Sequence, residues 1–289
     1  MHPLNDPVQL TLTELGEPEA IFRFSRGRFA ALLLLGVGLL VGGIALNYYW
    51  WVQGPRRIGH LQMVILLLLP LSGVSLLYHL YRQRGLTVLV YPVGLVRIQR
   101  HHAVIFPWSE VTQVRLGIKA ARKPVVERNE AGEITGCVIR PIIPLVRVWN
   151  VRLTLVRQDG VEADFTAVVA RCDDLVAQVQ RWTFAAQWPL LWQQLQQEGT
   201  VAFGPWKVSR QGVHTADETL TWANFLDLRL KIDKVFIQQR QRWLAWTSQP
   251  IENIPNLHLF WALVEELSRQ AALAPSDSRS AHPSSLGYS

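Results

Sequence analysis

Two long apolar runs near the start of the chain constrain its fold more than any other feature. The first spans residues 29–51 and the second residues 61–81, and neither contains an Asp, Glu, Lys or Arg. An uncharged stretch of about 20 residues matches a hydrocarbon core of ~30 Å when it is helical. A cleaved signal peptide would have a shorter apolar region nearer the terminus. The short link between the runs, residues 52–60, therefore predicts an antiparallel hairpin of two membrane-spanning helices.

Aromatic residues close both runs, as they do in membrane proteins at the level of the lipid headgroups. The predicted interface anchors are Tyr48, Tyr49, Trp50, Trp51, Tyr78 and Tyr81. Gly38 and Gly42 give the first helix a small-residue face on which another backbone could approach closely. Pro70 is expected to kink the second helix rather than end it.

Arginines near the ends of the runs predict the orientation. Two arginines, Arg56 and Arg57, lie in the link. Five flank the outer ends of the runs: Arg23, Arg26, Arg28, Arg82 and Arg84. The positive-inside rule then predicts a two-pass protein of the cell membrane with both termini in the cytoplasm. Because neither span contains a charged residue that would mark a conduction path, we expect a tether rather than a channel or transporter.

From residue 85 onward the pattern alternates between apolar and polar residues, which is typical of strands. The strands predicted in this first segment are residues 86–91, 95–98, 104–108, 111–116, 151–155 and 161–165. Asp159-Gly160 is a hairpin signal between the last two. The irregular stretch 119–145 indicates either an extended hairpin tip or a mobile loop. A helix should follow, with Asp173 and Asp174 in its first turn, and Pro189 should break or restart it.

A second segment repeats this pattern more compactly. Its predicted strands are residues 201–203, 207–209, 219–222, 226–232, 235–239 and 242–246, with Gly212 at a turn. Asn256 is a suitable cap for a final helix. That helix carries a stripe of apolar residues at helical spacing: Phe260, Leu263, Val264 and Leu267.

The two segments share a local phrase. A turn glycine, Gly94 or Gly212, precedes a strand, and a tryptophan, Trp108 or Trp222, follows some 10 to 14 residues later. Self-similarity of this kind indicates a duplicated domain. The phrase, with its W-x-[E/N]-[VF] step, resembles bacterial pleckstrin-homology-like domains. Two membrane helices before two such modules, with the step at residues 254–256 into the last helix, resemble a family of bacterial membrane proteins of unknown function over about residues 15–270.

This resemblance implies an α+β fold: a transmembrane helical hairpin followed by two pleckstrin-homology-like modules. Each module would be a seven-stranded, strongly bent antiparallel sheet closed by a C-terminal helix. The expected organisation is a cytoplasmic segment 1–28, the hairpin 29–81, a first module 85–198 with its insertion 119–145, a second module 199–270, and a disordered tail 271–289. The resemblance implies no reaction and no catalytic residue.

Motifs for catalysis, cofactors or metals are not found in the sequence. The histidines at residues 101–102 would point to opposite faces of a strand, and Cys137 and Cys172 lack the spacing of a metal site or disulfide framework. Glu162 and Asp164 share one face of a predicted strand, as expected for the wet side of a hairpin. We therefore predict a protein that is not an enzyme, with no cofactor and no metal. An enzyme acting on lipid or envelope substrates is the alternative, which a pocket gathering His, Asp and Glu from distant strands would favour.

Basic residues outnumber acidic ones, and the net charge is +7. Residues 115–157 contain nine Lys or Arg and three Glu, a surplus of six. The candidates for binding lipid or a partner are Arg115, Lys119, Arg122, Lys123, Arg140 and Arg147. Each cation close to anionic lipid adds about 1 kcal/mol, although a solvated basic face with no partner is equally compatible with the pattern.

Twelve tryptophans allow a recognition surface as well as a well-filled core. Trp108, Trp182 and Trp222 fall at predicted core positions. Five others fit either interpretation: Trp188, Trp192, Trp243, Trp246 and Trp261. We expect a scaffold or sensor that binds a protein partner or lipid headgroups, not nucleic acid, at the cytoplasmic face. Engagement of anionic lipid by the basic segment itself is the alternative.

Overall fold

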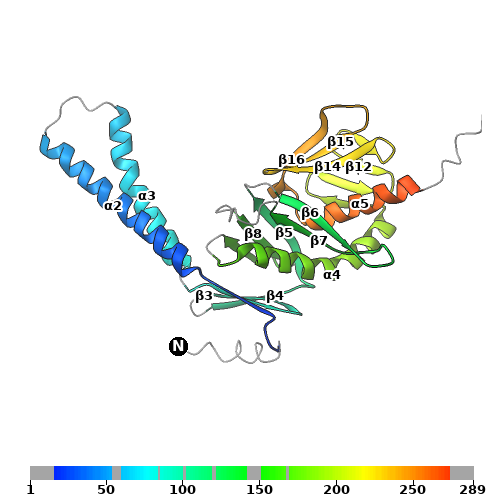
Figure 1. Ribbon diagram of the computed structural model, residues 1–289, viewed down its shortest axis with the longest axis horizontal. Coiled ribbons are helices and arrows are strands. Elements are labelled where there is room, and N and C mark those ends of the chain that lie inside the picture. Colours follow the sequence, from blue (N-terminus) through cyan, green and yellow to red (C-terminus); the bar gives the residue numbers. More distant parts are fainter. Residues whose placement is uncertain are drawn as a thin grey trace, which may run out of the picture. The chain divides into compact units, whose positions relative to one another are not determined.

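The computed structural model describes residues 16–53, 60–83, 85–99, 102–118, 122–141, 151–166 and 169–273 (Figure 1). The chain divides into two compact units. The first comprises Met1–Val111 and Arg157–Val176, and the second comprises Thr112–Val156 and Ala177–Ser289. Both contain antiparallel strands and helical residues, so the fold is mixed α+β, as expected.

Two helices occupy the positions of the apolar runs. They are α2 (Arg26–Gln53) and α3 (His60–Gln83), and Pro70 lies inside α3 without ending it. Within the described residues, α2 is the helix that is long and apolar enough to cross a membrane, over Phe29–Val52. The apolar part of α3 that meets the same test of composition, Leu67–Tyr81, is shorter. A membrane crossing by α3 therefore stays a prediction.

Glycines allow α2 and α3 to approach closely. A Cβ atom on Gly73 would lie 2.8 Å from the carbonyl oxygen of Gly36, and one on Gly43 would lie 2.8 Å from Cδ of Pro70. Real Cβ atoms do not come so near other atoms, so glycine at these positions sets the spacing of the two helices.

The predicted small-residue face of α2 is not the face that contacts α3. No described atom lies within 4 Å of the Cβ positions built at Gly38 and Gly42. The two glycines are four residues apart and share a face, but Gly36 and Gly43, seven apart, are the ones turned toward α3.

A short strand before α2, which no local pattern in the sequence predicts, joins the sheet that follows α3. This strand, β1 (Ala20–Arg23), pairs antiparallel with β2 (Thr87–Tyr91), and Arg23 lies opposite Thr87. β3 (Gly94–Gln99) and β4 (His102–Pro107) complete a four-stranded sheet in the order β1-β2-β3-β4. The α2–α3 hairpin is thus inserted between the first two strands of this sheet.

The last strands of the chain form two further antiparallel sheets in the second unit. The first sheet contains β10 (Thr200–Phe203), β11 (Trp206–Ser209), β12 (Gly212–His214) and β13 (Thr219–Thr221). The second contains β14 (Phe225–Lys231), β15 (Lys234–Gln239) and β16 (Ala245–Pro250). The short 3-10 helix η1 (Ile251–Asn253) and then α5 (Leu257–Leu273) follow. The predicted apolar stripe of α5 is buried, which confirms that helix.

Two predictions for these strands are wrong in detail. Gly212, predicted at a turn, is instead the first residue of β12, a strand that the sequence did not predict and that pairs with both β11 and β13. The strand predicted at residues 242–246 begins only at Ala245, because residues 240–244 form a wider turn with Gln241 at a φ of 64°.

The irregular stretch 119–145 contains a regular hairpin. β6 (Arg122–Arg128) pairs with β7 (Ile134–Pro141), with Arg122 opposite Pro141. Of the two readings of this stretch, the described part is therefore the hairpin tip. β5 (Val111–Ile118) and β8 (Val151–Arg157) flank it in the sequence and are neighbours in one sheet.

The turn at Asp159-Gly160 is confirmed in the first unit. Gly160 N donates to Arg157 O, and Arg157 N donates to Val161 O, each at 2.9 Å. Gly160 has a φ of 84°, which glycine adopts without strain. β9 (Glu162–Thr166) begins directly after this turn.

α4 (Cys172–Glu198) is one continuous helix, and Pro189 does not interrupt it. Proline lacks the N–H that would pair with the carbonyl of Ala185. Because Ala185 and Pro189 are both exposed, water can satisfy that carbonyl. Asp173 and Asp174 lie in the first turn, as predicted.

The compact units cut across the predicted modules. β5 to β8 and most of α4 share a unit with residues 199–273. The predicted bounds 85–198 and 199–270 therefore follow the repeat in the sequence rather than these units. The predicted tail, residues 271–289, lies outside the described residues from position 274 onward.

Candidate functional sites

The two tryptophans of the shared phrase occupy equivalent corners, each formed by a turn glycine and the tryptophan that follows it. Trp108 and Trp222 are both buried, as predicted. Nε1 of Trp108 donates to Tyr91 O at 3.0 Å, and Nε1 of Trp222 donates to Ser209 O at 3.2 Å. In both cases the acceptor stands three residues before the turn glycine, so the two corners are closed by the same bond.

The two turn glycines of the phrase share one steric requirement: a side chain at either position would run into the neighbouring strand. A Cβ atom on Gly94 would lie 2.7 Å from Phe106 O, and one on Gly212 would collide with Leu220 O. Each of these carbonyls stands two residues before its tryptophan. At both corners, only glycine lets the neighbouring strand come this close.

A backbone bond after each tryptophan also recurs. Gln158 N donates to Glu110 O, and Arg240 N donates to Asn224 O, each at 2.8 Å. Glu110 and Asn224 each stand two residues after the tryptophan. The likeness between the two segments therefore extends from residue types to hydrogen-bond geometry.

The predicted interface anchors are mostly exposed. Trp50 is half-buried, and the other five are between 55% and 81% exposed: Tyr48, Tyr49, Trp51, Tyr78 and Tyr81. Large aromatic side chains that the protein leaves uncovered at helix ends are available to a membrane interface.

The basic candidates are placed unequally. Lys123 is exposed at the start of β6, whereas Arg122 beside it is only 2% exposed. A buried guanidinium cannot reach a lipid headgroup, so Arg122 is unsuited to the role expected from its charge. Lys119 and Arg147 lie outside the described residues.

Two other basic candidates have partners within the protein. Nε and Nη2 of Arg115 donate to Gln113 Oε1 at 2.9 and 2.7 Å. Nη2 of Arg140 lies 3.3 Å from Glu127 Oε1. Much of the basic surplus of residues 115–157 is therefore engaged in contacts inside the chain.

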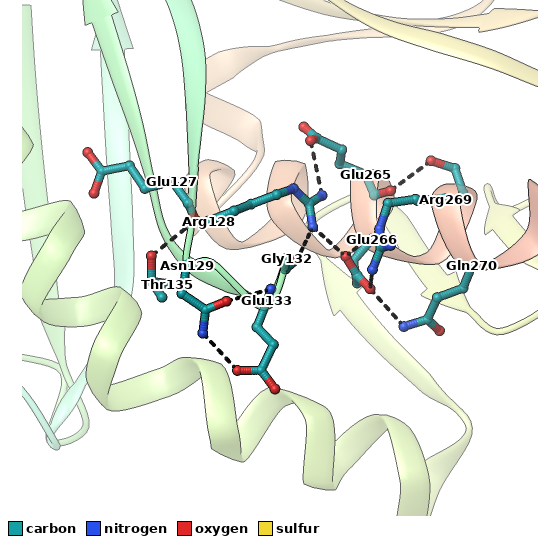
Figure 2. A network of polar contacts seen from close by, with 11 residues as sticks. Glu127, Arg128, Asn129, Gly132, Glu133, Thr135, Glu265, Glu266, Arg269 and Gln270 are labelled. Carbon is teal, nitrogen blue, oxygen red and sulfur yellow. Dashed lines mark hydrogen bonds and ion pairs between the residues drawn. The ribbon is translucent and has the colours of Figure 1, made fainter. Parts of the chain in front are cut away.

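Arg128, the last residue of β6, links the hairpin to α5 (Figure 2). Its Nη1 donates to Glu266 Oε2 at 2.9 Å and to Gly132 O at 2.9 Å. Its Nη2 donates to Glu265 Oε1 at 3.3 Å. One guanidinium thus holds both the hairpin turn and two carboxylates of the helix.

Glu266 is the most heavily bonded carboxylate of this network (Figure 2). It accepts from Arg269 Nη2 at 2.6 Å, from Gln270 Nε2 at 2.9 Å, and from Arg128. Burial alone would raise its pKa. The hydrogen bonds from these three donors outweigh burial and lower the pKa of Glu266 to about 2.

The tip of the hairpin is ordered by its own side chains (Figure 2). Asn129 Oδ1 accepts from Glu133 N at 2.9 Å, and Asn129 Nδ2 donates to Glu133 Oε2 at 2.9 Å. A cavity of about 660 Å³ adjoins the network, with Arg128, Glu265 and Arg269 in its wall. Because these charges already pair with one another, the network's direct effect is to fix the insertion to α5.

The tryptophans that the sequence left ambiguous fall into two groups. Trp261 is buried, and Trp188 stacks on Phe184 with ring centroids 4.8 Å apart. Trp192 meets Trp188 edge-on at 5.7 Å. Trp182, predicted in the core, is only half-buried. Packing thus accounts for the tryptophans of α4 and α5.

The turn between β15 and β16 is different. Trp243 is 91% exposed and Leu244 is 62% exposed. Arg240 and Arg242, beside them in the turn, are exposed too. An exposed apolar pair flanked by cations is typical of surfaces that meet a partner or a membrane interface.

A buried histidine was not anticipated from the sequence. His258 of α5 is fully buried, and its Nε2 lies 3.1 Å from Thr183 Oγ1. Because that hydroxyl donates to Val179 O at 2.7 Å, it accepts from Nε2–H, which assigns the tautomer. Burial lowers the pKa of His258 to about 3, so the ring is neutral.

Neither the cysteines nor the acidic residues form a metal site in the described part of the chain. Cys137 and Cys172 are free and buried, and burial raises the pKa of the Cys137 thiol. No group of three His, Cys, Asp or Glu side chains among the described residues is arranged to hold a metal ion. His102 is exposed, and His101 lies outside the described residues.

These observations define a mixed α+β protein with an apolar N-terminal helix long enough to cross a membrane, several antiparallel sheets and a C-terminal helix. Residues 143–272 match a family of unknown function (DUF6585). The match runs from the segment before β8 into α5 and leaves out the α2–α3 hairpin. Neither the curated proteins nor the solved structures contain a match.

Proposed function

We propose that the chain is a two-pass membrane protein that tethers two pleckstrin-homology-like modules at the cytoplasmic face. There the modules bind a protein partner or lipid headgroups, as a scaffold or sensor without catalytic activity. The pairing of β1 with β2 is the observation that carries the proposal.

The pairing bears on the number of crossings. Arg23 precedes α2, and Thr87, its partner, follows α3. Paired strands lie on one side of a membrane, so a chain that crosses with α2 must return before Thr87. α3 has 24 residues, which at 1.5 Å per residue exceeds the ~30 Å hydrocarbon core. We infer that α3 is the returning span.

The repeated corners support a duplicated module. Trp108 and Trp222 make equivalent hydrogen bonds, and the order of elements repeats as well. After the sheet β1–β4 come β5, β8, β9 and α4, and after the sheet β10–β13 come β14, β15, β16 and α5. Seven strands and a closing helix in each copy agree with the pleckstrin-homology-like resemblance, with β6–β7 as an insertion.

A binding role is supported by the β15–β16 turn, where Trp243 and Leu244 are exposed. The alternative role for residues 115–157, direct engagement of anionic lipid, has less support. Arg122 is buried, and Arg128 and Arg140 are ion-paired with glutamates.

The two-pass arrangement is tested by cysteine labelling of the full chain in native membranes. Background labelling should be low because Cys137 and Cys172 are buried. Val52→Cys, beyond the aromatic end of α2, should react with an impermeant maleimide from outside. Trp243→Cys should react only after permeabilisation. Reaction of both positions from the same side would overturn the two-pass arrangement.

The binding role is tested with a photo-crosslinking residue in place of Trp243. We expect a discrete protein or lipid adduct from native membranes. The matched control is Ile232, which is 61% exposed in the β14–β15 turn at the other end of β15. Recovery of the protein alone from both positions would refute the binding role.

A further inference from the structure

A groove lies between β14 and α5 in the second unit, formed by two adjoining cavities. One has a volume of about 660 Å³ and the other a volume of about 270 Å³. Their walls share Phe225, Leu226, Glu265 and Ser268, so the two cavities are parts of one groove, which we call the β14–α5 groove. The larger cavity lies within the range of ~300–1,000 Å³ in which small ligands bind.

The two ends of the β14–α5 groove differ in chemistry. At one end, the smaller cavity adds the apolar side chains of Leu228, Trp261 and Val264. At the other end, the larger cavity adds the cation Arg240 and reaches Ala272 near the end of α5. From Trp261 to Ala272 the helix advances about 16 Å, at 1.5 Å per residue. The groove is therefore elongated, with its cationic and apolar ends apart.

The wall between these ends is mainly apolar. Leu226, which both cavities share, is 50% exposed. In the same wall, the rings of Trp222 and Phe225 meet edge-on with centroids 5.6 Å apart. The carboxylate of Asp227 is ion-paired with Arg229 at 3.0 Å. An apolar chain in the groove would cover Leu226 and remove its surface from water, which is favourable.

Most charges beside the groove are balanced within the protein (Figure 2). Arg128 donates to both Glu265 and Glu266. Arg269 also donates to Glu266, at 2.6 Å. Two guanidinium groups thus stand against two carboxylates in this network. Arg240 adds a third guanidinium to the wall, and its positive charge is the one left over.

The guanidinium of Arg240 is held in position without a carboxylate. Its Nε donates to Phe225 O at 3.0 Å, and its backbone N donates to Asn224 O at 2.8 Å. Within the described part of the chain, no Asp or Glu forms an ion pair with this side chain. Because Nε is already bonded, Nη1 and Nη2 remain as a fork of donors that suits a carboxylate or a phosphate.

Only a ligand that combines two properties satisfies both ends of the groove. An uncharged apolar chain would leave Arg240 unpaired, and a small anion would leave Leu226 uncovered. An anionic head joined to a single apolar chain matches the guanidinium and the apolar wall together.

We propose that the β14–α5 groove binds a single-chain anionic lipid, with its head on Arg240 and its chain between β14 and α5. A long-chain fatty acid and lysophosphatidic acid share this chemistry, so the experiment must separate these two sources. The inference concerns the second unit alone. It does not depend on the number of membrane crossings or on the binding role of Trp243.

Photolabelling of the full-length protein in phosphatidylcholine nanodiscs tests the proposal. The probe is palmitic acid with a diazirine in its chain, and mass spectrometry of peptides locates the adducts. We expect adducts within residues 225–228 and 261–268. Excess palmitate or lysophosphatidic acid should remove them, and the stronger competitor identifies the source. Hexadecanol, which lacks the charge, and butyrate, which lacks the chain, should not. Adducts on α2 report the probe in the apolar phase and normalise the yield.

Variants assign the two halves of the site. Arg240→Gln should lower the normalised labelling of the groove at least about tenfold, the effect of one charge-assisted hydrogen bond. The matched control is Arg242→Gln, at an exposed arginine of the same turn that lines neither cavity. Leu226→Asn should also lower labelling, whereas Ile232→Asn, at an exposed residue beyond the end of β14, should not. The thermal midpoint of each variant shows whether it folds.

Four outcomes would overturn the proposal. The first is a groove that stays unlabelled while α2 is labelled. The second is equal competition by hexadecanol and palmitate, which would make the groove an apolar surface without a site for the head. The third is an equal loss of labelling in Arg240→Gln and Arg242→Gln. The fourth is displacement of the probe by trileucine at a lower concentration than palmitate requires, which would assign the groove to a peptide.

Discussion

Asn256 and Val114 exchange two hydrogen bonds, although 142 residues separate them. Asn256 N donates to Val114 O at 2.9 Å, and Val114 N donates to Asn256 Oδ1 at 2.8 Å. Asn256 Nδ2 also donates to Thr112 O at 2.9 Å. The backbone carbonyl of Asn256 accepts the first hydrogen bonds of α5, as the carbonyl of a helix cap does. The side chain of Asn256, however, bonds to β5 instead of to the helix. The predicted helix cap is thus a link between a strand and a helix.

Replacing Asn256 should destabilise the second unit in two separable steps. Asn256→Gly removes the side-chain bonds while tolerating the φ of 54°, and should lower the free energy of unfolding by about 1–3 kcal/mol. Asn256→Ala adds the strain of a left-handed backbone and should lower it by about 1 kcal/mol more. Urea unfolding in detergent measures both. A glycine variant as stable as the wild type would show that the side-chain bonds contribute nothing.

Gly73→Ala should disrupt the packing of α2 on α3. The added Cβ would lie 2.8 Å from two backbone atoms of α2, at Gly36 and Leu40, so the helices must separate. Gly38→Ala is the matched control, because no described atom lies within 4 Å of its Cβ. The thermal midpoint in detergent should fall for Gly73→Ala and not for Gly38→Ala. Equal midpoints would contradict the packing described for the hairpin.

Glu266→Gln should weaken the attachment of the β6–β7 hairpin to α5. We expect a loss of about 2–3 kcal/mol at neutral pH, because a charge-assisted network loses its acceptor. The pKa of Glu266 lies near 2, below the ordinary value of 4.5. Its contribution is therefore present above pH 4.5 and lost as the pH falls toward 2. The same loss from Glu265→Gln, a more exposed partner of Arg128, would argue against this role.

His258 should make the second unit sensitive to acid. Its folded pKa of about 3 lies below the ordinary value of 6.5. Between these values the unfolded chain binds a proton that the folded chain excludes. Stability should therefore be full above pH 6.5 and fall, by at most ~1.4 kcal/mol per pH unit, as the pH drops toward 3.

His258→Gln keeps a donor for Thr183 and removes the titration. Relative to the wild type, this variant should lose less stability on acidification between pH 6.5 and 3, as measured by urea midpoints. His102→Gln, at an exposed histidine, is the control and should retain the wild-type pH dependence. Identical profiles for His258→Gln and the wild type would exclude the buried ring as the cause.

Local patterns predicted most of the strands and helices correctly. The alternation around Val151 and the stripe around Phe260 depend on neighbours in the sequence, and both elements formed where expected. β1 was missed because it has only four residues, of which Phe22 alone is buried. Its partner β2 lies beyond the whole α2–α3 hairpin, so no local pattern could indicate the pairing.

The candidate sites were less predictable than the elements. Counting charges in residues 115–157 suggested a basic face, but Arg128 pairs with carboxylates 137 and 138 residues away. A polar cavity lined by His79, Arg97 and Asp164 combines α3, β3 and β9, three elements that no local pattern in the sequence connects. Such groups of side chains depend on which strands and helices pack against one another in the fold. No short stretch of the sequence specifies that packing.

The sequence by itself determined an apolar segment fit to enter a membrane, two β-rich segments with matching Gly and Trp positions, and a closing amphipathic helix. These follow from periodicity and composition, which act over a few residues. The tertiary structure alone decided that β1, before the hairpin, pairs with β2, after it. It also decided that Gly36, Gly43 and Gly73, rather than Gly38 and Gly42, lie where α2 and α3 approach each other. Finally, it decided that the side chain of Asn256 bonds to β5. The physical reason is that hydrogen bonds and close contacts depend on distance in space, which folding sets independently of distance along the chain.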